Sequence, residues 1–391
     1  MAYYFIFPET DTTIYSHPDR SKMNVGNDEL LELVKEPGST DQHHHPSRIL
    51  IKFKNEEIIN AISLMPEGTF TSSLLSSVSL QLSLAEANNI TTTHVLNAYA
   101  VSQSWNEGTG KYLNTPTASN GTSWVYRDNS TTATVWPLEG TFTTGTTGSL
   151  TSSNNVLTQG GGTWYTGSNF YGTQQFLKGD DLDTNINVKE IVNKWSASLS
   201  VGQTYPEGII NNGFLIKTLD NVETNASSSF GELQYFSSDT HTIYPPKLCF
   251  KWDDSINRNS QQIIHKNAKF NNINIILYDN KEIYNQNEIV KFKLHVRDKY
   301  PERSFTNDSN YLNVGYLTTG SFYSIRDAHT EREIIPFDDN FTKLSSDGDG
   351  MYFKLYMKGL QPERYYRILF KHIDDQGTRI YDDNYYFKVV R

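Results

Sequence analysis

The 391-residue sequence has little cysteine, little basic charge and no long apolar run. Its one cysteine, Cys249, cannot form an intramolecular disulfide and excludes a zinc site built on several thiolates. A net charge of -10 lacks the basic footprint of nucleic-acid or anionic-membrane binders. No stretch approaches the ~20 apolar residues of a membrane helix, and residues 3–7 are too short a run for a signal peptide. We therefore expect a soluble product of a cytoplasm, with no nucleic-acid or membrane partner.

Aromatic residues are plentiful, at 13% of the chain, with 24 Tyr and 20 Phe. They supply large apolar faces that a disordered chain lacks, so we expect a folded protein. The length allows two or three domains, although a single all-β domain can reach ~250 residues.

Hydrophobic residues recur mainly with a period of two, which is typical of half-buried β-strands. Three consecutive glycines, Gly160, Gly161 and Gly162, predict a turn with positive φ angles. The Thr/Gly-rich residues 141–148 predict a long polar loop. These patterns predict an all-β fold, and strands are expected at residues 48–54, 77–84, 244–252, 291–296, 352–357 and 385–390.

Helical signals are few. Residues 27–35 predict one short helix, which Pro37 and Gly38 would end. Residues 183–195 predict a second helix, with apolar residues 188, 191, 192 and 195 on one face.

The composition also predicts where one domain ends and the next begins. The strand expected at 244–252 would close an N-terminal domain of residues 1–252, and the polar residues 253–269 would form a linker. The remaining residues, 270–391, match an immunoglobulin-like sandwich in size and strand spacing.

Seven short pieces carry a family resemblance in the N-terminal part: residues 11–14, 47–53, 104–108, 123–124, 183–195, 212–217 and 246–248. In this order they resemble the DNRLRE-type domains of surface and phage structural proteins. This resemblance implies a jelly roll similar to carbohydrate-binding folds. The chain departs from the pattern by a long Thr/Gly/Asn insert at 141–169.

The C-terminal part, on residues 296–301 and 359–366, resembles the immunoglobulin-like domains of virion proteins of contractile-tailed phages. In such a sandwich, the Tyr365–Tyr366 pair near a strand start predicts a tyrosine corner, in which a tyrosine hydroxyl bonds back to its own loop.

Two clusters contain residues that bind metals. His43, His44 and His45 present imidazoles suited to a transition metal, although successive side chains of an extended segment point to opposite faces; a solvated loop is the alternative. Asp180, Asp181 and Asp183 present carboxylates suited to Ca²⁺. The alternative is that Asp183 caps the predicted helix. The segment from Ser346 to Gly350 lacks the glutamate that closes a calcium loop, and predicts a hairpin turn.

Four tryptophans, Trp105, Trp124, Trp136 and Trp164, offer rings for glycan stacking, or equally for a sandwich core or an assembly interface. Glu107 beside Trp105 would be a glycosidase carboxylate only if a second carboxylate lay ~5 to 10 Å away. A core tryptophan beside a loop glutamate is the alternative.

Together these features predict a non-enzymatic virion structural protein of a tailed phage, in the tail, neck or baseplate, without a required cofactor. It would act by association, burying strand edges and aromatic residues against other virion proteins and in a homo-oligomer. The alternative is a receptor-recognition or adhesin module that binds a host glycan.

Overall fold

The computed structural model describes residues 2–37, 44–90, 93–112, 120–136, 160–199, 208–225, 230–256, 273–300, 315–374 and 377–391. Within these residues β-strands dominate, and the α-helices are three short ones: α1 (Asn55–Ser63), α2 (Lys189–Leu199) and α3 (Asp220–Thr224). The predicted all-β fold is therefore confirmed. None of the helices in the described part is long and apolar enough to cross a membrane.

The chain divides into two compact units. The larger unit contains Ile6–Ile62 and Val78–Cys249, and the smaller unit contains Met1–Phe5, Ser63–Ser77 and Phe250–Arg391. The proposed domain boundary at residue 252 stays a prediction, and most of the proposed linker lies outside the described residues.

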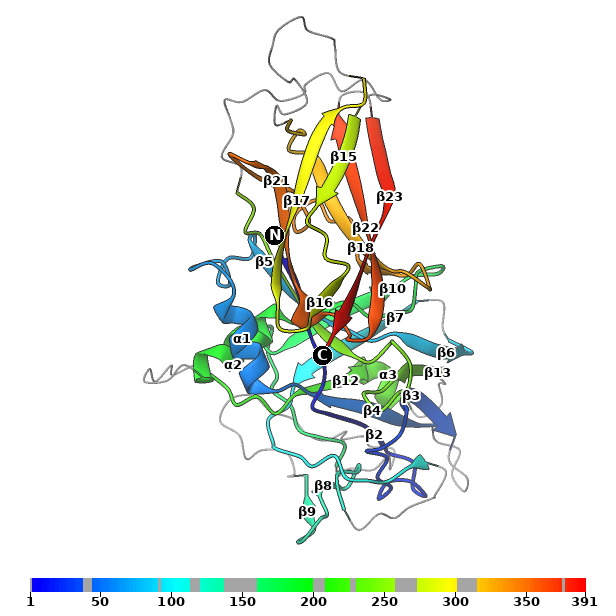
Figure 1. Cartoon of the computed structure of the whole chain (residues 1–391). Helices are drawn as coiled ribbons and strands as arrows, with labels where there is room; N and C mark the ends of the chain where they lie inside the picture. Colours follow the sequence, from blue (N-terminus) through cyan, green and yellow to red (C-terminus); the bar gives the residue numbers. More distant parts are fainter. Residues whose placement is uncertain are drawn as a thin grey trace, which may run out of the picture. The chain divides into compact units, whose positions relative to one another are not determined.

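The larger unit is built on an eight-stranded sheet of order β10-β7-β12-β4-β3-β13-β6, with β2 also paired to β4 (Figure 1). Strand β4 lies near its middle and is buried along most of its length. The strands are β2 (Thr10–Tyr15), β3 (Leu30–Pro37), β4 (His44–Lys52), β6 (Leu84–Asn88), β7 (His94–Ala100), β10 (Tyr171–Phe176), β12 (Phe214–Thr218) and β13 (Glu232–Phe236). A small hairpin pairs β8 (Tyr126–Asp128) with β9 (Thr134–Val135).

A second sheet has four strands in the order β1-β14-β5-β11. These strands are β1 (Ala2–Ile6), β14 (Lys247–Trp252), β5 (Ser76–Gln81) and β11 (Ile186–Asn187).

The smaller unit is a sandwich of two sheets, of orders β15-β17-β21-β20 and β16-β23-β22-β18-β19 (Figure 1). Taken in chain order, these strand sets follow the immunoglobulin plan, in which the first, second, fifth and fourth main strands face the third, sixth and seventh. The parallel pairing of β16 with β23 adds a short first-strand extension. The strands are β15 (Ile273–Tyr278), β16 (Ile283–Asn285), β17 (Ile289–Asp298), β18 (Ser321–Asp327), β19 (Glu333–Ile335), β20 (Ser345–Asp347), β21 (Gly350–Tyr356), β22 (Arg364–Asp374) and β23 (Gly377–Val390).

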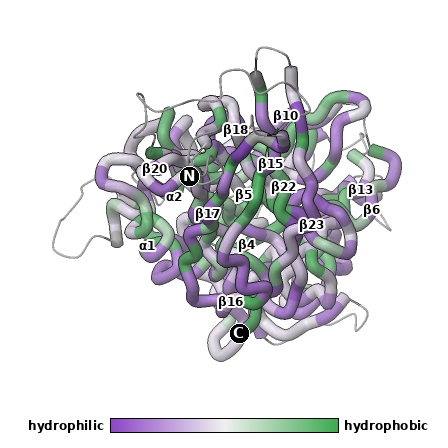
Figure 2. Tube along the Cα trace, turned by 45° about the horizontal axis from the view of Figure 1, so that its top comes forward, coloured by the Kyte–Doolittle hydropathy of each residue, from purple (hydrophilic) through white to green (hydrophobic). Residues whose placement is uncertain are grey.

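Stacked aromatic rings fill the space between these two sheets. The ring of Phe353 lies 4.9 Å from that of Phe292 and 4.4 Å from that of Tyr323, and Phe370 and Phe387 extend the stack. Hydrophobic and hydrophilic residues alternate along β17, which places Phe292 inward. Figure 2 colours each described residue of the chain by its hydropathy.

Three predictions from turn chemistry are confirmed. Gly160, Gly161 and Gly162 have φ angles of 96°, 81° and 89°. Asp347 pairs with Gly350, so the two residues between them form a tight hairpin loop. The hydroxyl of buried Tyr366, near the start of β22, donates to the carbonyl of Gln361 at 2.9 Å, which is the hydrogen bond of a tyrosine corner.

The helix predicted at 27–35 is wrong, because residues 30–37 form strand β3. Leu31 and Leu33 are buried while Glu32 between them is only half-buried, and β3 pairs with β13 from Leu30 to Val34. Period-two burial and sheet pairing thus outweigh the helix propensity of leucine and glutamate.

The second predicted helix is present but begins later. Within the predicted segment, Ile186–Asn187 form β11, and α2 runs from Lys189 to Leu199. The apolar face was predicted correctly, since Val188, Ile191, Val192 and Trp195 are all buried.

Candidate functional site

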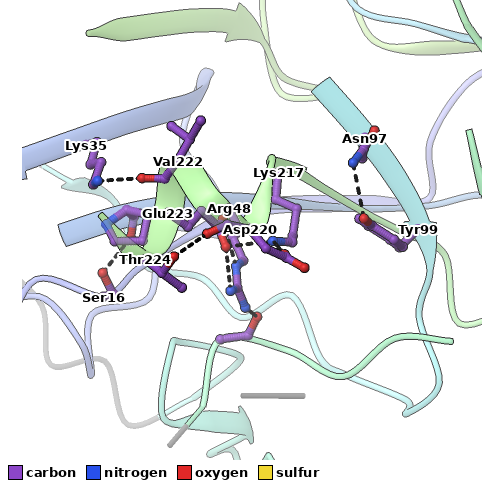
Figure 3. A network of polar contacts seen from close by, with 12 residues as sticks. Ser16, Lys35, Arg48, Asn97, Tyr99, Lys217, Asp220, Val222, Glu223 and Thr224 are labelled. Carbon is purple, nitrogen blue, oxygen red and sulfur yellow. Dashed lines mark hydrogen bonds and ion pairs between the residues drawn. The ribbon is translucent and has the colours of Figure 1, made fainter. Parts of the chain in front are cut away.

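The most elaborate polar site in the larger unit is a network of charges centred on Glu223 of α3 (Figure 3). The Arg48 guanidinium donates to both Glu223 carboxylate oxygens, at 3.2 and 2.8 Å, and the Lys217 ammonium donates to one of them at 2.7 Å. All three side chains are completely buried. Lys217 also contacts Asp220 at 2.5 Å, and the Asp220 side chain is largely exposed.

Two of the predicted tryptophans enclose this network. The Arg48 guanidinium lies 4.6 Å from the ring centroid of Trp124 and 4.9 Å from that of Trp164, within the range of cation–π attraction. Arg48 also donates to the carbonyl of Gly161 at 2.5 Å. A Cβ atom at position 161 would lie 2.6 Å from both an Arg48 nitrogen and the Trp124 ring, so this turn requires glycine.

The two cations beside Glu223 favour the ionised form of its carboxyl group. Burial alone would raise the pKa of Glu223, but the adjacent Arg48 and Lys217 hold it below its usual value. A carboxylate between two cations is satisfied by charge-assisted hydrogen bonds. Lys35 extends the arrangement, because its ammonium donates to the carbonyls of Val222, at 2.5 Å, and Asn225, at the C-terminal end of α3. The network thus ties β3, β4, β12 and α3 together.

Sequence reasoning did not identify this network. One signal was available, because Arg48 and Leu50 are two residues apart on a strand and therefore share a face. Leu50 packs into the tryptophan cluster, so Arg48 had to enter the core with it. Its partner Glu223, 175 positions away, carries no comparable signal.

The structure places three of the four predicted tryptophans in the core. Trp124, Trp136 and Trp164 are at most 5% exposed, which corresponds to the core role rather than to a platform for glycan stacking. Trp105 is half-buried, and its indole nitrogen donates to the carbonyl of Asn212 at 2.8 Å.

Glu107 does lie near a second carboxylate. It accepts a hydrogen bond from the backbone N–H of Asp11 at 2.8 Å, and burial raises the pKa of each carboxyl to about 7. However, Asp11 is 1% exposed, and its oxygens accept from the backbone N–H and hydroxyl of Ser238 at 2.7 and 3.0 Å. This geometry joins β2 to two loops and leaves Asp11 inaccessible to a polysaccharide.

The three aspartates 180, 181 and 183 accept hydrogen bonds from three different backbone N–H groups. Asp180 accepts from the backbone N–H of Leu177 at 2.8 Å, and Asp183 accepts from that of Leu84 at 2.7 Å. Asp181 accepts from the Asp183 N–H at 3.1 Å. The helix-capping alternative for Asp183 is wrong, because α2 begins at Lys189, whose N–H donates to the Asn187 side chain instead.

His43 lies outside the described residues, while His44 and His45 occupy the start of β4. His45 is buried against the ring of His17, with centroids 5.5 Å apart, and His44 is half-buried. Across the described ranges, no group of three or more His, Cys, Asp or Glu side chains is placed to hold a metal ion. The metal sites suggested by these clusters stay predictions.

Comparison with known proteins adds no relationship to this geometry: the sequence matches no family model and no curated protein.

Proposed function

We propose that this chain is a non-enzymatic structural protein of a tailed-phage particle, acting by association with copies of itself and with other virion proteins. The observation that carries the association is a block of two exposed tyrosines and two half-buried cations on the smaller unit. This block consists of Tyr365, Arg367, Tyr386 and Lys388, and we call it the tyrosine–arginine face.

Strand register puts these four side chains on one side of the five-stranded sheet. Tyr365 pairs with Lys388 and Arg367 pairs with Tyr386, while Tyr366 between them points into the core. Tyr365 is 47% exposed and Tyr386 39%. The Arg367 guanidinium lies 5.8 Å from the Tyr386 ring and the Lys388 ammonium 5.7 Å from the Tyr365 ring.

This composition favours a protein partner. Tyrosine and arginine are enriched in protein–protein interfaces and among their hot spots, because both combine a large contact area with directional hydrogen bonding. Acidic residues at the margin, Glu331, Glu363 and Asp382, pair with the cations and would form a polar rim.

The assignment to a phage particle, and within it to the tail, neck or baseplate, is supported by the resemblance of the N-terminal part to DNRLRE-type domains and of the C-terminal part to virion immunoglobulin-like domains. An immunoglobulin-like plan by itself serves many functions, so the fold supports association in general rather than one location.

Light scattering of the purified full chain tests self-association. We expect a discrete oligomer whose mass is unchanged by a chelator, and dissociation to monomers in the double variant Tyr365→Ala/Tyr386→Ala. Tyr278→Ala is the matched control, because Tyr278 is also 39% exposed but lies on the other sheet of the sandwich. A monomeric wild type, or an oligomer that persists in the double variant, would count against this face as a self-association surface.

A further inference from the structure

The larger unit contains an open pocket of about 430 Å³ where β3 begins and β13 ends. Leu30 and Phe236 are paired across these two strands, and both line the pocket. The remaining walls come from the segment before β3, from residues 111–112 and from the loop after β13. Its volume is within the ~300–1,000 Å³ range of small-molecule sites.

Two aromatic rings line this pocket, and each packs against another aromatic ring. Phe236 stacks on Tyr244, with centroids 5.5 Å apart. Tyr112 packs against Tyr15 at 5.9 Å and carries the Arg20 guanidinium 4.9 Å from its centroid. Both rings are half-buried, so part of each remains available to a ligand.

Hydrogen-bonding groups of both kinds surround the rings. Glu29 supplies a carboxylate, Lys111 an ammonium, and Thr240 and Thr242 hydroxyls that lie 3.0 Å apart. His241 approaches Glu29 at 4.0 Å, and both side chains are largely exposed. The lining therefore holds donors and acceptors without a concentration of positive charge.

Backbone contacts fix the walls of the pocket relative to one another. The Asp28 carboxylate accepts from the backbone of Glu29 and of Tyr112, which joins the first wall to the second. The Ser237 hydroxyl donates to the Asp28 carbonyl at 2.5 Å, which joins the first wall to the loop after β13. A site held in this way loses little entropy when it binds a ligand.

From this arrangement we infer that the pocket binds an uncharged sugar residue of a glycan, with its apolar ring face on Phe236 or Tyr112 and its hydroxyls on Glu29, Lys111 and the threonines. A sugar ring has one apolar face and a rim of hydroxyls that donate and accept, which matches aromatic rings surrounded by mixed polar groups. A carboxylated or phosphorylated ligand would need several cations, whereas Lys111 is the one lysine or arginine among the described residues that line the pocket.

Saturation-transfer NMR on the full chain tests this site, with the methyl glycosides of glucose, galactose, mannose and N-acetylglucosamine as probes and that of sialic acid as the acidic comparison. We expect at least one neutral glycoside to bind, and Phe236→Leu to weaken it about tenfold. Tyr171→Leu is the matched control, because Tyr171 is an exposed aromatic on β10, at the far edge of the same sheet.

Glu29→Gln provides a second variant for the case in which Phe236→Leu fails to fold. Glu29 is 52% exposed, so its replacement tests hydroxyl recognition without disturbing the core. Binding of none of the neutral glycosides at 10 mM, preference for the sialic acid glycoside, or affinity unchanged in both variants would overturn the inference. The inference does not depend on self-association, and the variants of the tyrosine–arginine face are expected to bind the glycoside normally.

Discussion

The two units of this protein handle charge in opposite ways. The larger unit buries Arg48, Lys217 and Glu223 completely, among tryptophans. The smaller unit fills its core with stacked phenylalanine and tyrosine rings. Among the described residues of that unit, every ion-paired lysine or arginine side chain stays at least 17% exposed, the value for Arg367 and Lys371.

The two units differ in buried charge because the segments that pack together in them differ in apolar content. In the smaller unit, strands with alternating apolar residues cover both sheets, so apolar packing alone defines the fold. In the larger unit, the short helix α3 and the glycine turn at 160–162 have few apolar side chains with which to be anchored. Charge-assisted bonds from Arg48, Lys35 and Lys217 hold these segments, at the desolvation cost that buried charges carry.

The largest expected effect breaks this network. Replacing Glu223 with Ala leaves Arg48 and Lys217 buried without their anion, and should lower the free energy of unfolding of the larger unit by about 3–5 kcal/mol. Denaturant unfolding followed by tryptophan fluorescence measures this, since five of the six tryptophans lie in the larger unit. Asp220→Asn is the control, because that side chain is 74% exposed and should cost less than about 1 kcal/mol. Equal losses in the two variants would show that burial of the network does not matter.

The next largest effect is the pH dependence of stability, which should differ between the two units. The pKa of Asp11 is raised from its ordinary value to about 7, so the folded state binds a proton more tightly than the unfolded state between about pH 4 and 7. This contribution is fully present below about pH 4, is lost as pH rises to 7, and amounts to about 2–4 kcal/mol. Glu107 acts in the same direction. In Asp11→Asn, unfolding curves between pH 4.5 and 7.5 should lose most of this slope.

The smaller unit should show the opposite sign. Burial opposes ionisation of Asp327 and Asp347, but hydrogen bonds from Arg364 and Lys291, with backbone N–H groups, hold both pKa values below normal. Their stabilisation is present above about pH 4 and is lost as pH falls further. The free energy of unfolding of the smaller unit, followed by circular dichroism, should therefore decrease below about pH 4 rather than between pH 4 and 7. A loss of stability on raising the pH would contradict this.

A smaller effect is expected at the tyrosine corner. Tyr366→Phe removes the hydrogen bond to Gln361 and should lower the free energy of unfolding of the smaller unit by about 1–1.5 kcal/mol. Tyr365→Phe is the matched control, because the neighbouring ring is exposed, and it should leave stability unchanged. If the two variants unfold alike, the corner contributes nothing beyond ring packing.

The smallest effect concerns a surface pair in the smaller unit. Glu333 contacts Arg326 at 2.6 Å, with the two side chains 45% and 28% exposed. Solvent screens this pair, so Glu333→Gln should change the free energy of unfolding by no more than about 0.5 kcal/mol. The ratio of this change to that of Glu223→Ala measures how much burial adds to an ion pair in this protein.

The sequence anticipated the smaller unit better than the larger one. In that unit, the strands expected at 291–296, 352–357 and 385–390 correspond to β17, β21 and β23, and the Asp347–Gly350 turn and the tyrosine corner were also predicted. All of these features depend on neighbours within a few residues. The same holds for the glycine turn at 160–162. The two wrong predictions concern residues with distant partners. The helix predicted at 27–35 is wrong because β13 pairs with Leu30–Val34, and the predicted cap is wrong because the Asp183 carboxylate accepts from the N–H of Leu84.

The amino-acid sequence by itself determined that this is an all-β protein, because alternation with period two and turn chemistry act locally along the chain. Only the tertiary structure decided where the buried charge network and the pocket lie. The Arg48–Glu223 pair and the pocket between Tyr112 and Phe236 each join residues more than 100 positions apart. Tertiary packing also decided that Trp124 and Trp164 enclose a buried cation. Long-range pairing is a property of the closed fold: the spacing of Arg48 and Leu50 indicates a buried cation, but no local pattern identifies Glu223 as its partner.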